Sequence, residues 1–284
     1  MRGLALIPND QPKNEGKTNP KITKIETQKR KGRYNVYLDG EYAFPIDESV
    51  LVNHVLFKGM EISKEFQKQL EEEDDFSKAF SRAVNYLSYS LRSEREVRDD
   101  LLKHEFSLET AEKAIEKLKT MKYIDDLTYA ESYTRTAANL NGKGPYTIRQ
   151  ELKKRGVHDT IIEQALMQYP LEQRIENGVA AANKVLKRTK QSSSKETANK
   201  VRQNLMQKGF NSDEITEILT HIDTEKEVDD EYEALKRHGE KIWRKQSKLT
   251  GSKKIQKVKT NLYQKGFDGE LITQFINEKE LEEE

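Results

Sequence analysis

The sequence predicts a mainly α-helical protein, a tandem array of about four three-helix modules that follows a small N-terminal β-hairpin or meander. After the acidic run Glu71–Asp75, apolar residues recur with the 3.6-residue period of a helix. A longer motif then repeats along the rest of the chain. Hydrophobic residues make up only 34% of the chain and charged residues 35%, which suits small modules that each bury a narrow seam against a neighbour.

The N-terminal part has the pattern of a small β-rich unit. Asp39-Gly40 is a strong hairpin dipeptide, and residues alternate between polar and apolar on both sides of it. Asp47 is expected to cap a short helix over residues 48–55, with residues 57–62 closing the unit. Residues 1–20 carry several Pro and Gly residues among polar ones and are expected to be disordered. The segments expected to form strands are Ile22–Gln28, Tyr34–Leu38 and Glu41–Phe44.

A basic turn lies between the first two expected strands. Lys29, Arg30, Lys31 and Arg33 are candidates for contacts with DNA. The alternative is that they form a solvated edge that discourages strand pairing, a common use of charge in β-sheets.

An eleven-residue motif occurs four times without internal gaps. The copies cover residues 96–106, 147–157, 200–210 and 257–267. The anchor leucines are Leu101, Leu152, Leu205 and Leu262, separated by 51, 53 and 57 residues. Downstream of each copy, apolar residues recur at one fixed set of offsets: Ala111, Ala114 and Ile115; Ile162, Ala165 and Leu166; Ile215, Ile218 and Leu219; Ile272, Phe275 and Ile276. So many matching positions predict four copies of one structural unit.

The third copy shows how a unit folds. Val201 and Leu205 are four residues apart, so they share one helix face. Gly209 is expected to end this helix in a left-handed conformation, and Ser212 or Asp213 to cap the next one. An earlier helix, around residues 179–186, completes the module.

The expected domain limits follow from the repeat. In the first copy Glu105 stands where the later copies have glycine, so that helix end is expected to be less ideal. The expected divisions are residues 1–20 (disordered), 21–63 (β-rich unit), 64–126, 127–172, 173–226 and 227–284 (helical repeats one to four).

Basic residues fall at two fixed positions of the motif. The first column is Arg98, Arg149, Arg202 and Lys259, and the second is His104, Arg155, Lys208 and Lys265. Each member of the first column follows a buried position by one residue, about 100° around the helix, so it flanks the seam and reaches solvent. Arginine there suits paired hydrogen bonds to phosphate or carboxylate. The alternative is solvated surface charge, some of it paired locally with acidic neighbours.

The sequence offers no site that resembles an enzyme's. There is no cysteine, and the five histidines are scattered without a metal-ligand pairing, so no metal or cofactor is expected. Gly142-Lys143-Gly144 lacks the spacing of a phosphate loop, and Asp126 is better explained as a helix cap than as half of a catalytic pair. No stretch reaches the roughly 20 apolar residues that cross a bilayer. We therefore expect a non-enzymatic, cytoplasmic monomer.

Aromatic residues lie inside some of the basic blocks. Tyr146 and Trp243 could stack on nucleic-acid bases, although packing within a module is the default for both.

Three stretches resemble one family. Residues 83–98 contain Leu87-Ser88, Arg92-Ser93-Glu94 and Glu96-Val97-Arg98, similar to the first-module signature of RecX proteins. Residues 123–133 resemble that family's linker into a second module, and residues 142–157 resemble the second module itself. The β-rich extension is similar to that of longer, Gram-positive-type members. Shorter members have three helical modules and this chain has four, which leaves open which modules bind.

This resemblance implies a regulator that binds the filament of RecA on single-stranded DNA and inhibits RecA ATPase and strand exchange, in recombination, DNA repair and the SOS response. Single-stranded DNA, and as a second option double-stranded DNA, is then a partner besides RecA. The expected contact residues are Arg92, Arg98, Lys143, Arg149, Lys154, Arg155, Arg202, Lys208, Lys259 and Lys265. The alternative is a general nucleic-acid-binding scaffold without a recombinase partner. A net charge of only +1 favours the regulator, because a dedicated DNA binder is usually more basic.

Overall fold

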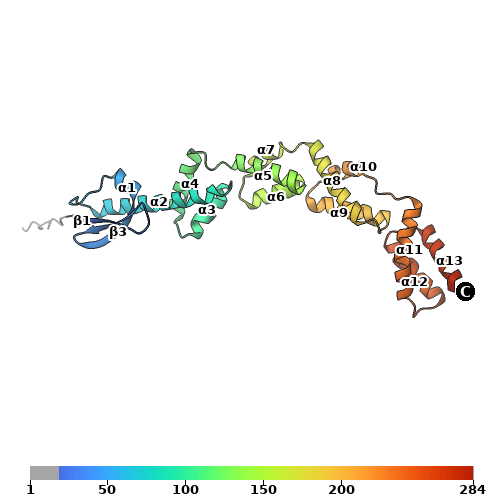
Figure 1. Cartoon of the computed structure of the whole chain (residues 1–284). Helices are drawn as coiled ribbons and strands as arrows, with labels where there is room; N and C mark the ends of the chain where they lie inside the picture. Colours follow the sequence, from blue (N-terminus) through green and yellow to red (C-terminus); the bar gives the residue numbers. More distant parts are fainter. Residues whose placement is uncertain (1–18, 284) are drawn as a thin grey trace, which may run out of the picture. The chain divides into compact units, whose positions relative to one another are not determined.

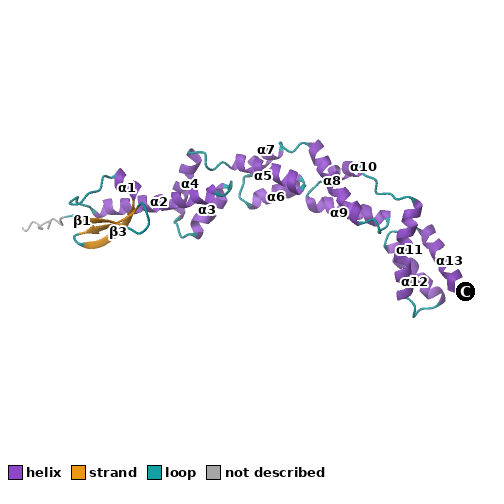
Figure 2. Cartoon of the chain, viewed as in Figure 1, coloured by secondary structure: helices purple, strands orange, loops and turns teal. Residues whose placement is uncertain are grey.

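The computed structural model describes residues 19–283, and over this range the chain is mainly helical (Figure 1). Thirteen helices and three strands lie in the described range, and all three strands are near its start (Figure 2). The predicted fold class is therefore confirmed. The disorder expected for residues 1–20 falls almost entirely outside the described residues.

Two compact units divide the chain. The first runs up to Leu91 and takes in Val97–Ile124, and the second consists of Arg92–Glu96 and Asp125–Glu284. The domain limits expected from the repeat are finer than this division and stay a prediction.

In the first unit, three antiparallel strands form a sheet in the order β1-β2-β3. Asp39 and Gly40 join β2 to β3 with φ angles of +49° and +95°, the left-handed conformation that a tight hairpin turn needs. The sheet buries Ile22, Val36 and Phe44 in a core of its own. The strands are β1 (Ile22–Thr27), β2 (Arg33–Leu38) and β3 (Glu41–Asp47).

The long helix α2 (Lys64–Ser88) belongs to two cores. Leu70 packs with the sheet, whereas Ala79 and Ala83 pack with α3 (Glu94–Lys103) and α4 (Leu108–Thr120). The helical period thus begins before the acidic run, at Lys64, because the hydroxyl of Ser63 caps the helix by accepting from Phe66 N at 3.1 Å. A short helix, α1 (Glu48–Asn53), starts at the expected cap Asp47.

The second unit contains nine helices within its described residues, and each consecutive three bury one hydrophobic cluster. The helix predicted around residues 179–186 is longer than expected, since α8 begins at Leu171. The helices are α5 (Asp126–Asn141), α6 (Pro145–Lys154), α7 (Asp159–Leu166), α8 (Leu171–Arg188), α9 (Ser194–Lys208), α10 (Ser212–Thr220), α11 (Val228–Lys245), α12 (Gly251–Gln264) and α13 (Gly269–Glu283).

The cap expected for α10 was one residue off. Ser212 or Asp213 was predicted, but Asn211 caps the helix by accepting from Glu214 N at 2.8 Å. The Glu214 carboxylate accepts from Asn211 N at 2.9 Å in return, so a reciprocal capping box decides the position.

The cap expected for α5 was also one residue off. Asp125, and not Asp126, caps the helix by accepting from the amides of Leu127 and Thr128. Asp126 instead accepts from Glu94 N at 2.8 Å, which ties α5 to the segment that precedes it in the second unit.

All four motif copies end their helix in the same way. The residue after the glycine position donates its amide to the carbonyl of the anchor leucine, five residues earlier, as in a Schellman motif. These pairs are Phe106–Leu101, Val157–Leu152, Phe210–Leu205 and Phe267–Leu262, at 3.1 to 3.3 Å. Gly209 is left-handed as predicted, and so are Gly156, Gly266 and Glu105, with φ of +66° at the glutamate.

Candidate nucleic-acid interface

One kind of hydrogen bond to the main chain recurs between consecutive helical segments of the second unit. A polar group at the start of one motif helix donates to a main-chain carbonyl at the end of the next. Its three examples are Ser93 Oγ to Arg155 O at 2.6 Å, Gly144 N to Lys208 O at 2.7 Å, and Ser193 Oγ to Lys265 O at 2.6 Å. Three members of the second basic column therefore stand at equivalent junctions, in a register that hydrogen bonds fix.

The junctions also explain the glycines. A Cβ on Gly156 would lie 2.3 Å from Arg95 Cδ, and one on Gly209 would lie 2.4 Å from the backbone nitrogen of Thr147. Glycine is needed there both for its positive φ and for this close approach. Glu105, at the same position of the first copy, is exposed, so a side chain can be accommodated there.

The members of the first basic column differ in whether an acidic side chain pairs with them. In the first two copies a glutamate stands 14 residues after the arginine and holds it in a forked pair. Arg98 donates from Nε and, at 3.2 Å, from Nη2 to Glu112. Arg149 donates from Nε at 2.9 Å and from Nη2 at 2.8 Å to Glu163. The guanidinium groups of these two arginines already donate paired hydrogen bonds to a carboxylate.

In the last two copies the same downstream position is threonine. Thr216 and Thr273 donate their hydroxyls to helix carbonyls of their own turns, at 2.9 and 2.8 Å. The side chains of Arg202 and Lys259 are exposed and form no hydrogen bond or ion pair with any other residue that the structure describes. The column therefore presents uncompensated cations only in its second half.

Lys143 is bound within its own module. Its ammonium donates to both carboxylate oxygens of Glu151, at 2.6 and 2.8 Å, and the hydroxyl of Tyr133 donates to the same carboxylate. The hydrogen bond to Glu151 raises the pKa of Lys143. Lys154, at the end of α6 and about one turn after Glu151, is exposed and has no ion pair with a described residue.

Arg155 is largely occupied at its junction. It donates to Glu96 at 2.8 Å and to the hydroxyl of Tyr129 at 3.1 Å, and its guanidinium lies 4.9 Å from the ring centre of Tyr133. Partial burial alone would lower its pKa, but Tyr129 and Glu96 outweigh it and the pKa is raised. Arg92 is half-buried in the segment before α3, in the same unit.

Lys208 is part of a group of like charges. Its ammonium donates to the carbonyl of Asn141 at 2.9 Å. Burial, followed by the nearby charges of Lys184 and Lys143, lowers the pKa of Lys208. The smaller part of this shift, due to the two lysines, reflects positive potential around Lys208.

The last junction holds an aromatic residue that the sequence analysis missed. A depression of about 340 Å³ is lined by Lys195, Tyr263 and Lys265, together with Glu196, which is paired with Lys200 at 2.7 Å. Tyr263 is 68% exposed. The signal was present in the sequence, since Tyr263 occupies an outward position of the motif two residues before Lys265. Exposed aromatic rings beside cations suit stacking on nucleic-acid bases.

The two aromatic residues named from the sequence have different environments. Tyr146 is 60% exposed, so its ring is accessible for stacking. Trp243 is only 7% exposed and packs edge-on against Phe275 in the core of the last three helices, with the Lys254 ammonium 4.0 Å from its ring centre. Its burial excludes the stacking role considered for it.

Within residues 19–283, no three His, Cys, Asp or Glu side chains gather in a way that could hold a metal ion. Over the same range, no helix is both long and apolar enough to cross a membrane.

Family models match along most of the chain. The model of the regulatory protein RecX N-terminal domain matches residues 20–63. The first, second and third three-helix domains of RecX match residues 79–118, 125–166 and 172–219, and the third matches again at 229–276. The chain belongs to the RecX family. Its four helical modules are thus three kinds of RecX domain, with the last kind present twice.

Relatives of similar length support this membership. Regulatory protein RecX of Levilactobacillus brevis is 42% identical over 90% of this chain and 96% of its own length. Regulatory protein RecX of Oceanobacillus iheyensis is 40% identical over 91% of this chain and 97% of its own. Among solved structures, a crystal structure of regulatory protein RecX, 40% identical, superposes with a TM-score of 0.62 over 71% of this chain and 99% of its own. That of RecX from Lactobacillus salivarius, also 40% identical, has a TM-score of 0.51 over 52% of this chain and 97% of its own.

Proposed function

We propose that this RecX-family chain binds the filament of RecA on single-stranded DNA and inhibits RecA ATP hydrolysis and strand exchange. In this way it would restrain recombination, DNA repair and the SOS response as a cytoplasmic monomer. Membership of a family of regulatory proteins supports the proposal. The observation that carries it is the recurring junction, which places basic side chains at equivalent positions of successive modules.

A repeating protein suits a repeating target. A nucleoprotein filament offers the same carboxylates and phosphates again and again, and modules joined by the same contact can meet them at corresponding places. Arg202 and Lys259 occupy the same motif position, 57 residues apart, and both are exposed. They can therefore bind an acidic target without first giving up a partner within the described chain.

The predicted contact residues divide into two groups on this proposal. Those that retain charge for a partner are Lys154, Arg202, Lys208, Lys259 and Lys265. Those held by the fold are Arg98, Arg149, Lys143 and Arg155, and half-buried Arg92 is assigned with them. A bound arginine must break its pair before it contacts a phosphate, so it contributes less to binding.

The alternative is a general nucleic-acid-binding scaffold without a recombinase partner. Such a protein would bind bare DNA tightly and with a steep salt dependence, because each phosphate contact releases counterions. The even balance of 50 basic and 49 acidic residues favours the filament regulator.

RecA ATP hydrolysis on single-stranded DNA, measured while the chain is titrated in, tests the proposal. We expect inhibition by the wild-type chain, and weaker inhibition by the double variant R202A/K259A. The matched control is R98A/R149A, which removes the same charge from the same motif position but from arginines that are already paired. It should inhibit nearly as well as the wild type. Absence of inhibition by the wild-type chain would refute the regulator. Equal losses in both variants would refute the division of the column.

A further inference from the structure

A basic groove lies in the first unit, and His104 is the one member of the motif columns that lines it. Its volume is about 660 Å³, and it is bounded by the β1–β2 turn, one face of α2 and the turn after α3. Five of its eleven lining residues are arginine or lysine, and only Asp47 is acidic. Some of these cations are neutralised within the fold and others are not.

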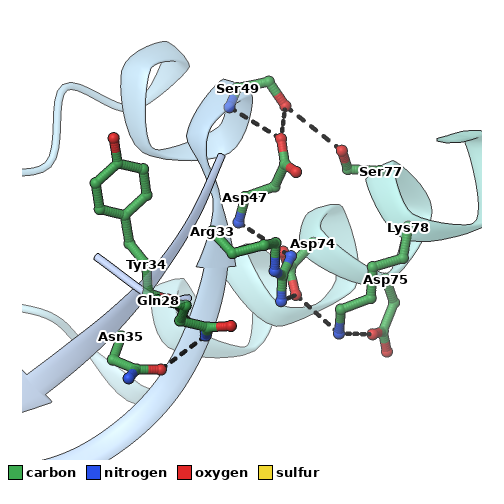
Figure 3. Close-up of polar contacts among 10 residues, drawn as sticks. All are labelled: Gln28, Arg33, Tyr34, Asn35, Asp47, Ser49, Asp74, Asp75, Ser77 and Lys78. Atoms are coloured by element: carbon green, nitrogen blue, oxygen red, sulfur yellow. Dashed lines mark hydrogen bonds and ion pairs between the residues drawn. The ribbon is translucent and has the colours of Figure 1, made fainter. Parts of the chain in front are cut away.

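Asp74 neutralises the base of the groove. Its carboxylate, 3% exposed, accepts from Arg33 through two guanidinium nitrogens, from Lys78 at 2.9 Å and from Asp47 N at 2.7 Å (Figure 3). Lys78 also pairs with Asp75 at 3.0 Å, so the two cations face two carboxylates. Arg33 and Lys78 come from β2 and α2, so this network fixes the start of β2 on the helix. These two cations are structural.

A second carboxylate neutralises the far wall. Arg82 of α2 forms a forked pair with Asp100 of α3, with both nitrogen–oxygen distances at 2.8 Å. His104, just after α3, also contacts this helix, since its Nδ1 lies 2.8 Å from the carbonyl oxygen of Asp100. This wall is therefore close to neutral.

Two cations on the rim remain uncompensated. Arg30 and Lys31 are exposed and have no hydrogen bond or ion pair to another residue in the described range 19–283. The turn that carries them is held in place, because Gln28 N donates to Arg33 O at 2.8 Å and Glu48 N donates to Gly32 O at 2.9 Å. Because the backbone of the turn is fixed, binding an anion at the edge of this polar groove has to order only the two side chains.

We propose that this groove binds backbone phosphates of single-stranded nucleic acid through Arg30 and Lys31. The inference deepens the proposed function and rests on it, because it gives the β-rich extension the role of holding DNA while the helical modules meet the filament. The arginine fork suits a phosphate diester, and lysine adds a point charge beside it. An extended single strand of nucleic acid fits this groove better than a small anion does. The unpaired charges lie on the exposed rim, and the donors inside the groove already bind Asp74 and Asp100.

The test is binding of a fluorescein-labelled dT30 strand to the full chain, followed by anisotropy over a series of sodium chloride concentrations. The variant is R30A/K31A. Its matched control is K58A/K64A, which removes two exposed lysines of the same unit that lie outside the groove and have no ion pair among the described residues. Each phosphate contact on a single strand contributes about 0.7 to the slope of log K against log salt. We expect the slope to fall by about 1.4 in R30A/K31A and to change little in the control, with thermal midpoints alike in all three.

An unchanged slope in R30A/K31A, or an equal fall in the control, would overturn the inference. Competition with inorganic phosphate at constant ionic strength distinguishes a site for nucleic-acid phosphates from a site for small free anions. We expect it to displace dT30 no better than chloride, and displacement at millimolar phosphate would show a small-anion site instead. RecA inhibition is measured on the same preparations. If the wild type inhibits RecA but the slope is unchanged, the groove alone fails. If it does not inhibit but the slope falls, the proposed function fails and the groove stands.

Discussion

Replacement of Gly209 by alanine should disrupt the junction between the second and third helical modules. The φ angle of +90° costs a residue with a Cβ about 1–2 kcal/mol. The new Cβ would also lie 2.4 Å from the backbone nitrogen of Thr147, so the start of α6 and the end of α9 must separate. That separation weakens the hydrogen bonds from Gly144 N to Lys208 O and from Tyr146 N to Gly209 O, each worth about 1 kcal/mol. The total is about 3–4 kcal/mol.

Gly142→Ala is the matched control. Gly142 has a positive φ of +57°, but the nearest atom to its added Cβ is the flexible Lys208 Nζ at 3.8 Å. Only the conformational cost applies there, so the two variants should differ by about 2 kcal/mol, the part due to the junction.

Amide hydrogen exchange of the full chain reads out this difference locally, without the assumption that a chain of several modules unfolds in one step. We expect the amides of Gly144 and Tyr146 to exchange about 30-fold faster in G209A than in G142A, which is the equivalent of 2 kcal/mol. Equal exchange in the two variants would show that the close approach at Gly209 does not hold the modules together.

Three further predictions concern single residues. Glu105→Gly should stabilise the first unit by about 1 kcal/mol, seen as a higher urea midpoint, because it relieves a left-handed glutamate; a lower midpoint would contradict this. Asp74→Asn should destabilise the same unit by about 3 kcal/mol in urea unfolding, because Arg33 and Lys78 lose a nearly buried counter-charge; a cost under 1 kcal/mol would count against the network. Burial lowers the pKa of His238, so its contribution is present above the ordinary histidine pKa of about 6.5 and is lost as the pH falls through the lower folded value. The thermal midpoint of the wild type should therefore fall more than that of His238→Gln between pH 7.5 and 5.5, and parallel falls would show that His238 is not involved.

Local patterns explain what the sequence could predict. The helix that contains Val201 and Leu205 and ends at Gly209 depends on neighbours within ten residues, so its period and end were predictable. The cap at Asn211 was missed by one residue because Asn, Ser and Asp cap almost equally well, and only the reciprocal bond with Glu214 separates them.

Contacts between helices explain what the sequence could not predict. Four basic residues in one column looked equivalent, yet Arg98 is held by Glu112 on the next helix, whereas threonine stands at the corresponding position after Arg202. The helix α2 extends through the acidic run because Asp74, within that run, is buried against Arg33 of the sheet. Such pairings depend on how helices and strands pack together, which periodicity within one segment does not reveal.

Affinity for the RecA filament relative to bare DNA distinguishes the regulator from a general nucleic-acid scaffold. The measurement compares labelled dT30 alone with the same strand carrying assembled RecA, at equal salt concentration. We expect the wild-type chain to bind the filament at least about tenfold more tightly, a difference of about 1.4 kcal/mol, with a shallower salt dependence than on the bare strand. Equal affinities with the same steep salt slope would contradict the account, because they would show a protein that recognises phosphate alone.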